Sequence, residues 1–231
     1  MASNVPKHIS IILDGNRRYA KKLGMHPWKG HEYGVKKLGQ LLEWCRELGI
    51  KELTLYSFST ENFNRTKTEK DFLLNIFKQE FNKLKYKEEI YKNKIRINVI
   101  GRLHMFPKDI QKSIKEIMKK TKNHNNFIVN FAMAYGGRQE IVDAFRNIIK
   151  HSKKLKPNQI NEKLITNNLY LKNEPDLVIR PGGEMRISNF LIWQSSYSEL
   201  VFLNKLWPEF TKGDLIHCIG EFNKRERRFG R

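Results

Sequence analysis

Charged and small polar residues follow an apolar segment near the start of this 231-residue chain. The apolar run begins at His8 and stops at Asp14-Gly15-Asn16-Arg17-Arg18, after which the pattern becomes basic and helical. A carboxylate can hold a divalent metal ion, and arginines attract phosphate groups. A helix that begins after the glycine would add free backbone N–H groups for an anion. These residue types predict a metal-assisted site for a diphosphate.

Three more polar clusters follow apolar segments further along the chain. They are Ser59–Arg65, Tyr135–Arg138 and Arg180–Arg186. These clusters and the first one also have structural explanations. Asp-Gly-Asn and Gly-Gly are turn sequences, and Ser-Thr-Glu is typical of a helix N-cap. Turns alone do not explain arginines at three such positions beside hydroxyl and amide groups. We therefore expect one cleft that combines these side chains: Asp14, Asn62, Arg65, Arg180 and Arg186.

The apolar segments before these clusters are rich in β-branched residues and nearly continuous in apolar character. Such runs are typical of strands covered on both faces, as in a parallel sheet. The carboxyl ends of parallel strands lie on one edge, where α/β proteins bind their ligands. The six predicted strands are Ile9–Leu13, Leu53–Phe58, Ile95–Ile100, Phe127–Met133, Leu177–Ile179 and Leu200–Leu203.

Segments with helical periodicity alternate with these strands. The alternation predicts one doubly wound α/β domain over residues 1–231, with a central, mostly parallel six-stranded sheet flanked by helices. The predicted helices are Val35–Leu48, Glu69–Tyr91, Pro107–Thr121, Gln139–His151 and Asn161–Leu169. The tail Glu221–Arg231 is expected to be a solvated amphipathic end with a loose terminus.

The chain is strongly basic, with 44 Lys and Arg against 24 Asp and Glu and a formal charge of +20. This balance favours a polyanionic partner, which could be nucleic acid, an anionic lipid surface or a phosphorylated substrate. Charge alone does not choose among them. The basic run Lys83–Lys94 is expected to continue a helix and to expose its charge to solvent.

The two cysteines, Cys45 and Cys218, are far apart and form no CxxC motif, so we expect two buried thiols in a reducing cytoplasm. The chain has no N-terminal signal pattern and no apolar run of about 18 residues. We expect a cytoplasmic protein, with peripheral contact to a membrane left open.

With these residues in view, the chain resembles the cis-prenyltransferases, the family of undecaprenyl and dehydrodolichyl diphosphate synthases. The resemblance implies repeated, Mg²⁺-dependent condensation of isopentenyl diphosphate with an allylic diphosphate such as farnesyl or geranylgeranyl diphosphate, with new Z double bonds. The YAKK form is similar to archaeal and eukaryotic members. The matching motifs, in family order, are HISIILDGNRRYAKK, GHEYG, LTLYSFSTENFNR, AYGGR, DLVIRPGGEMRISNFLIWQSSYSEL and LWPEF.

The resemblance assigns catalytic roles to Asp14, which would act with Mg²⁺ at the allylic diphosphate, and to Asn62 at the reacting centre. Glu199 matches a carboxylate of the metal site or its network, although an exposed strand-edge charge explains it equally well. His31 matches a histidine near the allylic diphosphate, although histidines in such positions are more often packed or capping. The substrate-binding residues implied by motif match are Gly15, Asn16, Arg17, Arg18 and Tyr19 for the allylic diphosphate, Ser59, Thr60, Glu61, Phe63 and Arg65 for the reacting centre, and Arg180, Arg186, Ile187 and Ser188 for isopentenyl diphosphate.

The C-terminal residues Arg228 and Gly230 match an RxG element that, in the family, reaches the isopentenyl diphosphate of the partner subunit. The resemblance therefore implies a homodimer. Two positions depart from many bacterial members. Pro27 replaces an arginine, so a primer-phosphate contact is missing or comes from Lys29 or His26, and Met185 replaces a histidine. Both departures leave the primer preference open.

The leading hypothesis is thus a cis-prenyltransferase that makes a medium or long polyprenyl diphosphate for lipid carriers, with no nucleic-acid partner. A basic nucleic-acid-binding protein is the alternative from charge, and a non-catalytic subunit of a heteromeric synthase is the third. Retention of Asp14 and the STENF and RxG motifs disfavours the non-catalytic subunit. The proton acceptor stays open among the Asn62 region, Asp14 and a diphosphate oxygen. Bulky side chains such as Phe77 or Phe81 could line a product tunnel or simply pack in the core.

Overall fold

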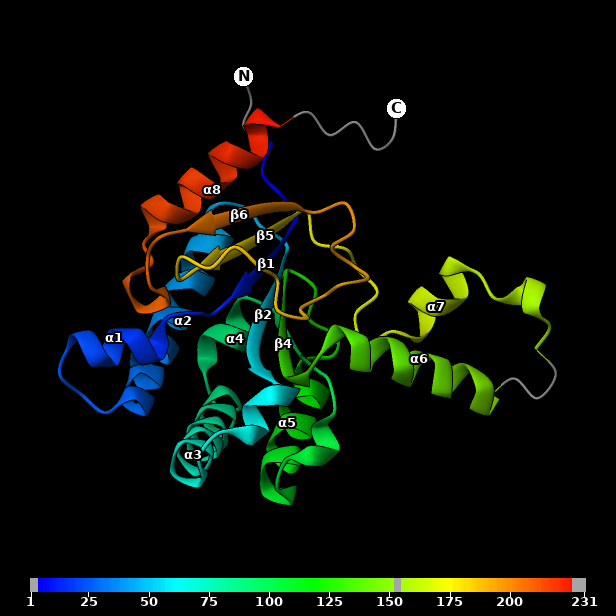
Figure 1. The fold of residues 1–231 in the computed structure, drawn as a ribbon, viewed down its shortest axis with the longest axis horizontal. Coiled ribbons are helices and arrows are strands. Elements are labelled where there is room, and N and C mark those ends of the chain that lie inside the picture. Colours follow the sequence, from blue (N-terminus) through cyan, green and yellow to red (C-terminus); the bar gives the residue numbers. More distant parts are fainter. Residues whose placement is uncertain (1–3, 152–154, 226–231) are drawn as a thin grey trace.

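The computed structural model describes residues 4–151 and 155–225. At the centre of this structure lies a six-stranded sheet (Figure 1). All neighbouring strands pair in parallel, in the order β3-β4-β2-β1-β5-β6. The predicted fold class is therefore confirmed, and every strand of the described sheet is parallel. The strands are β1 (His8–Ile12), β2 (Glu52–Ser59), β3 (Ile95–Ile100), β4 (Phe127–Tyr135), β5 (Leu177–Pro181) and β6 (Glu199–Leu203).

The main hydrophobic core lies on one face of this sheet. Alternate strand residues such as Ile9 and Ile11 of β1 point into it, because successive side chains of a strand face opposite sides. Helices α2, α3, α5 and α8 supply the other half of this core. The helices are α1 (Asn16–Lys22), α2 (Gly30–Glu47), α3 (Lys67–Leu84), α4 (Glu88–Lys92), α5 (Lys108–Thr121), α6 (Gly137–His151), α7 (Glu162–Asn168) and α8 (Lys212–Lys224).

The opposite face of the sheet carries a buried polar row that the apolar strand patterns did not predict. Ser10, Thr54, Asn130 and Asn98 are aligned in register across four neighbouring strands. The Asn130 amide donates to Thr54 Oγ1 at 3.0 Å and to Glu52 Oε1 at 2.7 Å, and Asn98 donates to Asn130 Oδ1 at 3.0 Å. The amides of the row are thus hydrogen-bonded within the sheet, whereas Ser10 Oγ is buried with no hydrogen-bond partner among the described residues.

Helix α6 starts at the sheet and extends away from it, with α7 beside it (Figure 1). These two helices have a small core of their own, which includes Ala144 and Ile165. The second face of the sheet is covered in part by the irregular segment 186–198, where Phe190 stacks on Tyr56 with ring centroids 4.6 Å apart. The helices are therefore concentrated on one face, rather than shared between both as the doubly wound pattern predicted.

The predicted helix Glu69–Tyr91 is divided into α3 and α4 in the structure. Lys87 adopts an extended conformation, and the Tyr91 hydroxyl donates to the carbonyl of Lys85 at 2.6 Å, which satisfies the end of α3. The amino group of Lys85 pairs with Glu116 of α5 at 2.8 Å. The basic run therefore breaks the helix, and part of its charge is neutralised.

Helix α8 was not predicted, since only a solvated tail from Glu221 was expected. It begins with a capping box in which the side chains of Thr211 and Asp214 cap each other's backbone N–H groups. Its face that includes Cys218 and Phe222 is buried. Cys45 is likewise buried, and both thiols are free, as predicted. In the described chain, no helix has the length and apolar character needed to cross a membrane.

The packing of α1 against α2 fixes the first polar cluster. A Cβ atom on Gly30 would lie 1.8 Å from the carbonyl oxygen of Asn16, so only glycine permits this approach. On the other side, the backbone N–H of Trp207 donates to the Asp14 carbonyl at 2.9 Å, and its indole donates to the Gly34 carbonyl at 3.0 Å. The turn after β1 is thus held on two sides.

Candidate active site

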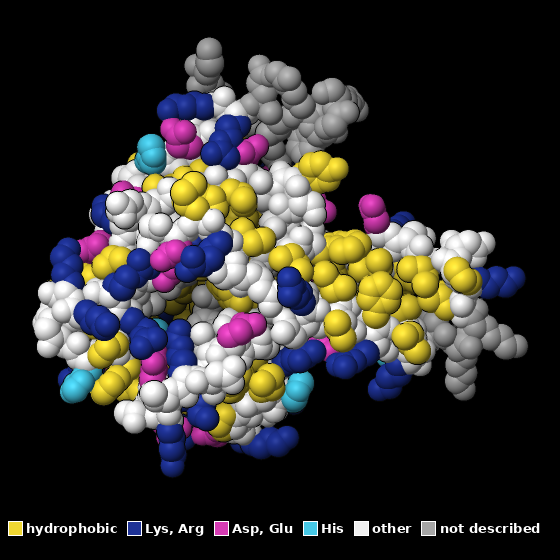
Figure 2. Space-filling view, viewed as in Figure 1, with side chains coloured by type: hydrophobic (Ala, Val, Ile, Leu, Met, Phe, Trp, Pro, Cys, Tyr) yellow, Lys and Arg dark blue, Asp and Glu magenta, His cyan; other side chains and the backbone are white. Residues whose placement is uncertain are grey.

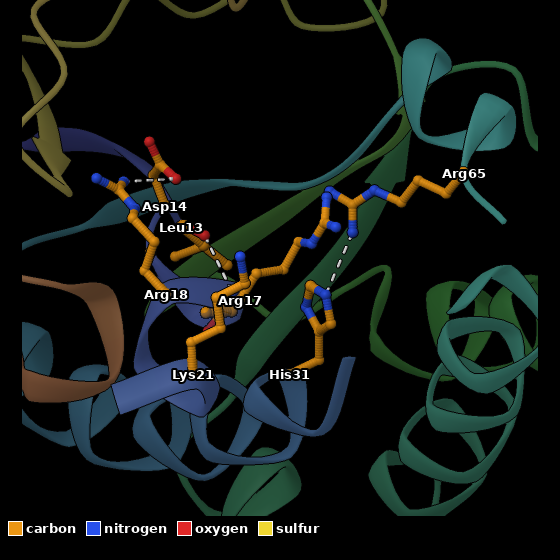
Figure 3. A pocket seen from close by; sticks show the side chains of 9 residues that line it. Leu13, Asp14, Arg17, Arg18, Lys21, His31 and Arg65 are labelled. Carbon is orange, nitrogen blue, oxygen red and sulfur yellow. Dashed lines mark hydrogen bonds and ion pairs between the residues drawn. The ribbon is translucent and has the colours of Figure 1, made fainter. Parts of the chain in front are cut away.

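A cleft of about 370 Å³ opens where β1 ends (Figure 3). Gly15, with a φ of 106°, turns the chain from β1 into α1, and no side chain caps that helix. The glycine has the left-handed backbone conformation that this turn requires. The cleft is lined by Leu13, Asp14, Gly15, Asn16, Arg17, Arg18, Lys21, His31 and Arg65. Its lining is strongly basic, with Asp14 as the one carboxylate among these residues.

An ion pair joins this cleft to the end of β5. Arg180 donates to Asp14 Oδ2 at 2.9 Å, and Arg18 approaches Asp14 Oδ1 at 3.2 Å. Arg180 also donates to Ser188 Oγ at 2.8 Å and to the Arg186 carbonyl. The Arg180 side chain is only 6 % exposed, so this guanidinium is held between the two clusters. The prediction that Asp14 and Arg180 meet is confirmed by this contact.

Glycine at position 182 permits this junction. Gly182 has a φ of 107°, and a Cβ there would lie 2.8 Å from an Arg18 nitrogen and 3.1 Å from the Asp14 side chain. Beyond it, Glu184 pairs with Arg186 at 2.6 Å and lies 4.0 Å from Arg18. The Arg186 side chain is 62 % exposed, so its charge stands at the surface of the second cluster.

A buried carboxylate orders the cations at the far side of the cleft. Arg65 donates to Glu69 Oε1 at 2.7 Å and to His31 Nε2 at 3.2 Å, and Arg17 lies 3.8 Å from the same Glu69 oxygen (Figure 3 shows the Arg65 and His31 side chains). Because arginine can only donate, His31 Nε2 is the acceptor of a neutral ring. Burial and the charge of Arg65 lower the pKa of His31 to about 4.

The STENF motif forms the 3₁₀ helix η2 (Thr60–Asn64) directly after β2. Asn62 caps it, since its Oδ1 accepts the backbone N–H of Ser59 at 3.0 Å. Phe63 packs against Phe58 and Phe106, with centroids 4.9 and 5.6 Å away. Thr60 Oγ1 is buried with no hydrogen-bond partner among the described residues. The motif thus connects this aromatic cluster with Arg65, which lines the cleft.

Several predicted residues do not line the cleft itself. Of the five residues expected to share one cleft, Asp14 and Arg65 line it, whereas Asn62, Arg180 and Arg186 do not. Asn62, Ser59, Thr60, Glu61 and Phe63 belong to η2 and its flank, while Ile187 and Ser188 belong to the segment that Arg180 holds. Tyr19 packs against Tyr33, with ring centroids 5.2 Å apart, on the side of α1 away from the cleft. Arg228 and Gly230 lie outside the described residues.

Glu199 is far from Asp14 within one chain. It is the first residue of β6, whereas the cleft lies at the carboxyl edge of the sheet, and its carboxylate pairs with Arg225 at 2.6 Å. Its predicted role in metal binding stays a prediction. The alternative, a charge at the edge of a strand, explains the contacts of Glu199 that the structure describes.

Two side chains of the site were missed from the sequence. Lys21 lines the cleft, and Glu69 organises three of its basic side chains. Both follow an arginine at helical spacing, since Lys21 is four residues after Arg17 and Glu69 four after Arg65. This spacing was the available signal. Lys29 and His26, suggested as substitutes at Pro27, do not line the cleft.

The donor set fits a metal ion that arrives with a phosphorylated ligand. The described residues contain no group of three or more metal-ligating side chains. The Asp14 carboxylate, however, is 29 % exposed and faces a cleft lined by cations. Mg²⁺ typically binds one or two carboxylates together with substrate phosphates, and does not need a cage made only of protein atoms.

The fold and the cleft define the class as a parallel α/β protein with a basic cleft at the carboxyl edge of its sheet. A family model described as "Putative undecaprenyl diphosphate synthase" matches residues 12–230. The chain therefore belongs to this prenyltransferase family, as the motifs predicted, and is a transferase.

Relatives resemble the chain over nearly its whole length. A protein of Thermococcus kodakarensis named tritrans,polycis-undecaprenyl-diphosphate synthase (geranylgeranyl-diphosphate specific) is 50% identical over 100% of this chain and 89% of its own. An isoprenyl transferase of Thermus thermophilus is 43% identical over 98% and 89%. The crystal structure of lavandulyl diphosphate synthase from Lavandula x intermedia, in complex with dimethylallyl diphosphate, has a TM-score of 0.92 and 34% identity, with 98% of this chain and 99% of that one covered.

A pH titration tests the arrangement around His31. An NMR titration of the native protein should give His31 a pKa near 4, because burial and Arg65 oppose its protonation. Between pH 6.5 and 4 the unfolded chain then binds a proton that the folded chain does not. The contribution of His31 to the free energy of unfolding therefore falls as the pH falls through this window, by up to about 1.4 kcal/mol per pH unit, and is constant above it.

The variant Arg65→Gln supplies the control for this titration. It removes the neighbouring cation, so the pKa of His31 should rise toward its ordinary value of 6.5. A wild-type pKa already near 6.5, or no upward movement in the variant, would show that His31 and Arg65 do not interact as the structure describes.

Proposed function

We propose that this protein elongates an allylic diphosphate with isopentenyl diphosphate, forming Z double bonds and a medium or long polyprenyl diphosphate. The observation that carries the proposal is the Asp14–Arg180 contact, which joins two arginine-rich clusters in a single site. Two clusters suit a reaction between two diphosphates. The geranylgeranyl specificity in the name of the Thermococcus relative supports geranylgeranyl diphosphate as the primer.

The basic residues of the cleft would bind the diphosphate of the primer. Ionisation of an allylic diphosphate leaves a delocalised carbocation and a highly charged leaving group. Arg17, Arg18 and Lys21 surround the space where that charge would develop. Charges fixed in advance stabilise such a transition state without reorganisation. The network of Glu69 and Asp14 therefore serves catalysis by holding the cations in place.

Arg180, with Arg186 and Ser188, would orient isopentenyl diphosphate beside the primer. The double bond of isopentenyl diphosphate would attack the allylic carbon of the primer, and a proton would leave C2 of isopentenyl diphosphate. Asn62 is a poor candidate for the acceptor, because an amide is a weak base and its Oδ1 already accepts the Ser59 N–H. We propose that Asn62 holds η2 in position. Asp14 or a diphosphate oxygen then accepts the proton.

Asp14 would hold Mg²⁺ together with the primer diphosphate. When bound, the ion supplies Lewis-acid stabilisation of the leaving diphosphate. Asp14 itself orients Arg18 and Arg180, whose nitrogens lie 3.2 and 2.9 Å from its two oxygens. The carboxylate can thus arrange both clusters in relation to each other.

The aromatic cluster next to η2 would accept the growing chain. Phe77 of α3 lies 5.5 Å from Phe58 between ring centroids, and Phe106 packs on both rings. Phe81 is buried further along the same helix. Phe63 and Phe77 are only partly buried, and such apolar side chains near a basic cleft suit a substrate with a charged head and a hydrocarbon tail.

A direct assay tests this function. Labelled isopentenyl diphosphate and Mg²⁺ are supplied with geranyl, farnesyl or geranylgeranyl diphosphate, and the products are separated by chain length. We expect metal-dependent elongation, with geranylgeranyl diphosphate preferred. Asp14→Asn should lower turnover by at least about 100-fold, since it removes one preorganised charge of the site.

The control for Asp14→Asn is Asp109→Asn. Asp109 pairs with Lys78 on the surface of α5, away from the cleft, so this change should leave turnover unchanged. Absence of elongation with every primer, or full activity in Asp14→Asn, would refute the proposed function.

We also propose a homodimer, formed through α6. An exposed apolar stripe runs along this helix, with Val142 45 %, Phe145 36 % and Ile149 71 % exposed. Figure 2 shows hydrophobic side chains gathered over α6 and α7. The spacing of the stripe suits packing against a helix of a second copy. A dimer would also allow the tail with Arg228 and Gly230 to reach the partner's site.

Light scattering tests the dimer. The native chain should have twice the 27.5 kDa mass of one chain. The double variant Val142→Glu and Ile149→Glu should dissociate it toward that mass, because charges would be buried without partners. Ile216→Glu on α8 changes an isoleucine that is 50 % exposed and should keep the dimer. A native monomer, or equal behaviour of both variants, would contradict the proposal.

A further inference from the structure

We propose that the protein has a second anion site, at the amino-terminal end of the sheet, which binds a phosphate group. A cavity of about 210 Å³ lies there, lined by Arg46, Ile50, Lys51, Lys92, Asn93, Asn126 and Phe127. The lining combines three cations with two amides over an apolar floor and contains no carboxylate. This site does not depend on the proposed prenyl transfer.

The cavity is well separated from the cleft at Asp14. Lys51 directly precedes β2, and Asn126 directly precedes β4. Arg46 and Lys92 come from the last turns of α2 and α4. Ser59, next to η2, is at the other end of β2, and eight residues at about 3.3 Å each place it roughly 26 Å from Lys51. The two sites therefore occupy opposite edges of the sheet.

The cations of this cavity have no acidic partner in the part of the chain that the structure describes. No ion pair joins Arg46, Lys51 or Lys92 to a described carboxylate, whereas Lys83 and Lys85 of the same basic run pair with Glu80 and Glu116. Three positive charges around one cavity, with no carboxylate in its lining, attract an anion. The unpaired charge thus points to an anionic ligand.

Hydrogen bonds hold one of these cations in a defined position. The Arg46 guanidinium donates to Asn93 Oδ1 at 2.6 Å, and the Asn93 amide donates to the Glu89 carbonyl at 2.8 Å. An arginine fixed in this way presents its remaining N–H donors at low entropic cost, and its planar fork matches phosphate oxygens. The arrangement favours a phosphate over a less charged anion.

The cavity has room for such a ligand. Its volume equals that of roughly seven water molecules at about 30 Å³ each, which is enough for a phosphate monoester or a diphosphate. A phospholipid head group and a free phosphate compound would offer the same chemistry. Inorganic phosphate and lipid vesicles, used as separate probes, distinguish these two sources.

The first arm uses inorganic phosphate and the ¹⁵N-labelled full chain. We expect saturable NMR shifts at Asn93 and Asn126, distinct from any shift at Gly15 in the cleft. The double variant Arg46→Gln and Lys92→Gln should raise the half-saturating concentration at Asn126 by at least about tenfold, since it removes two charged contacts. The matched control is Lys112→Gln with Lys115→Gln, two exposed lysines of α5 that do not line the cavity.

The second arm measures sedimentation of the same proteins with vesicles of phosphatidylcholine containing phosphatidic acid. Loss of vesicle binding in the cavity variant alone would identify a lipid head group as the ligand. Phosphate shifts at the cavity with unchanged vesicle binding would identify a free phosphate compound. The proposal is overturned if neither probe affects the cavity, or if both double variants weaken binding equally, since binding would then follow net charge and not this site.

Discussion

The ion pair between Asp14 and Arg180 is the contact on which the arrangement of the active site depends. It connects the turn after β1 with the end of β5, two neighbouring strands whose carboxyl ends meet at one edge of the sheet. Arg180 is almost completely buried, so the loss of Asp14 would leave a guanidinium without its counter-charge. Gly182 lets the two segments approach closely enough for the pair to form. The site is therefore one unit, although its residues are far apart in the sequence.

A few carboxylates organise a much larger number of cations around this pair. Glu69 contacts Arg65, Arg17 and His31, and Asp14 contacts Arg18 and Arg180. These contacts fix the directions of the cations without neutralising the cleft, which leaves it ready for an anionic substrate. Burial among arginines also keeps His31 neutral, as its lowered pKa shows. The basic cleft thus accounts for part of the net charge of +20.

The sequence was most informative where a pattern repeats along the chain. Continuous apolar runs predicted the six strands, and polar residues at their ends predicted the meeting of Asp14 with Arg180. Features that depend on a partner distant in sequence were not predictable, such as the ion pair of Lys85 with Glu116 of α5 at the end of α3. Glu69 was missed because a carboxylate at helical spacing from an arginine usually marks a surface pair, and only tertiary packing buries it. Helix α8 was missed although its capping box, with Thr211 and Asp214, was present in the sequence.

A double-mutant cycle on the free energy of unfolding tests the central claim most directly. The variants Asp14→Asn, Arg180→Gln and their combination are compared by denaturant unfolding with the same cycle for the exposed pair of Asp109 and Lys78. If Asp14 and Arg180 join the two clusters, their coupling energy should be about 1–3 kcal/mol, while the surface pair should give less than about 1 kcal/mol. Additive effects of Asp14→Asn and Arg180→Gln would contradict the account.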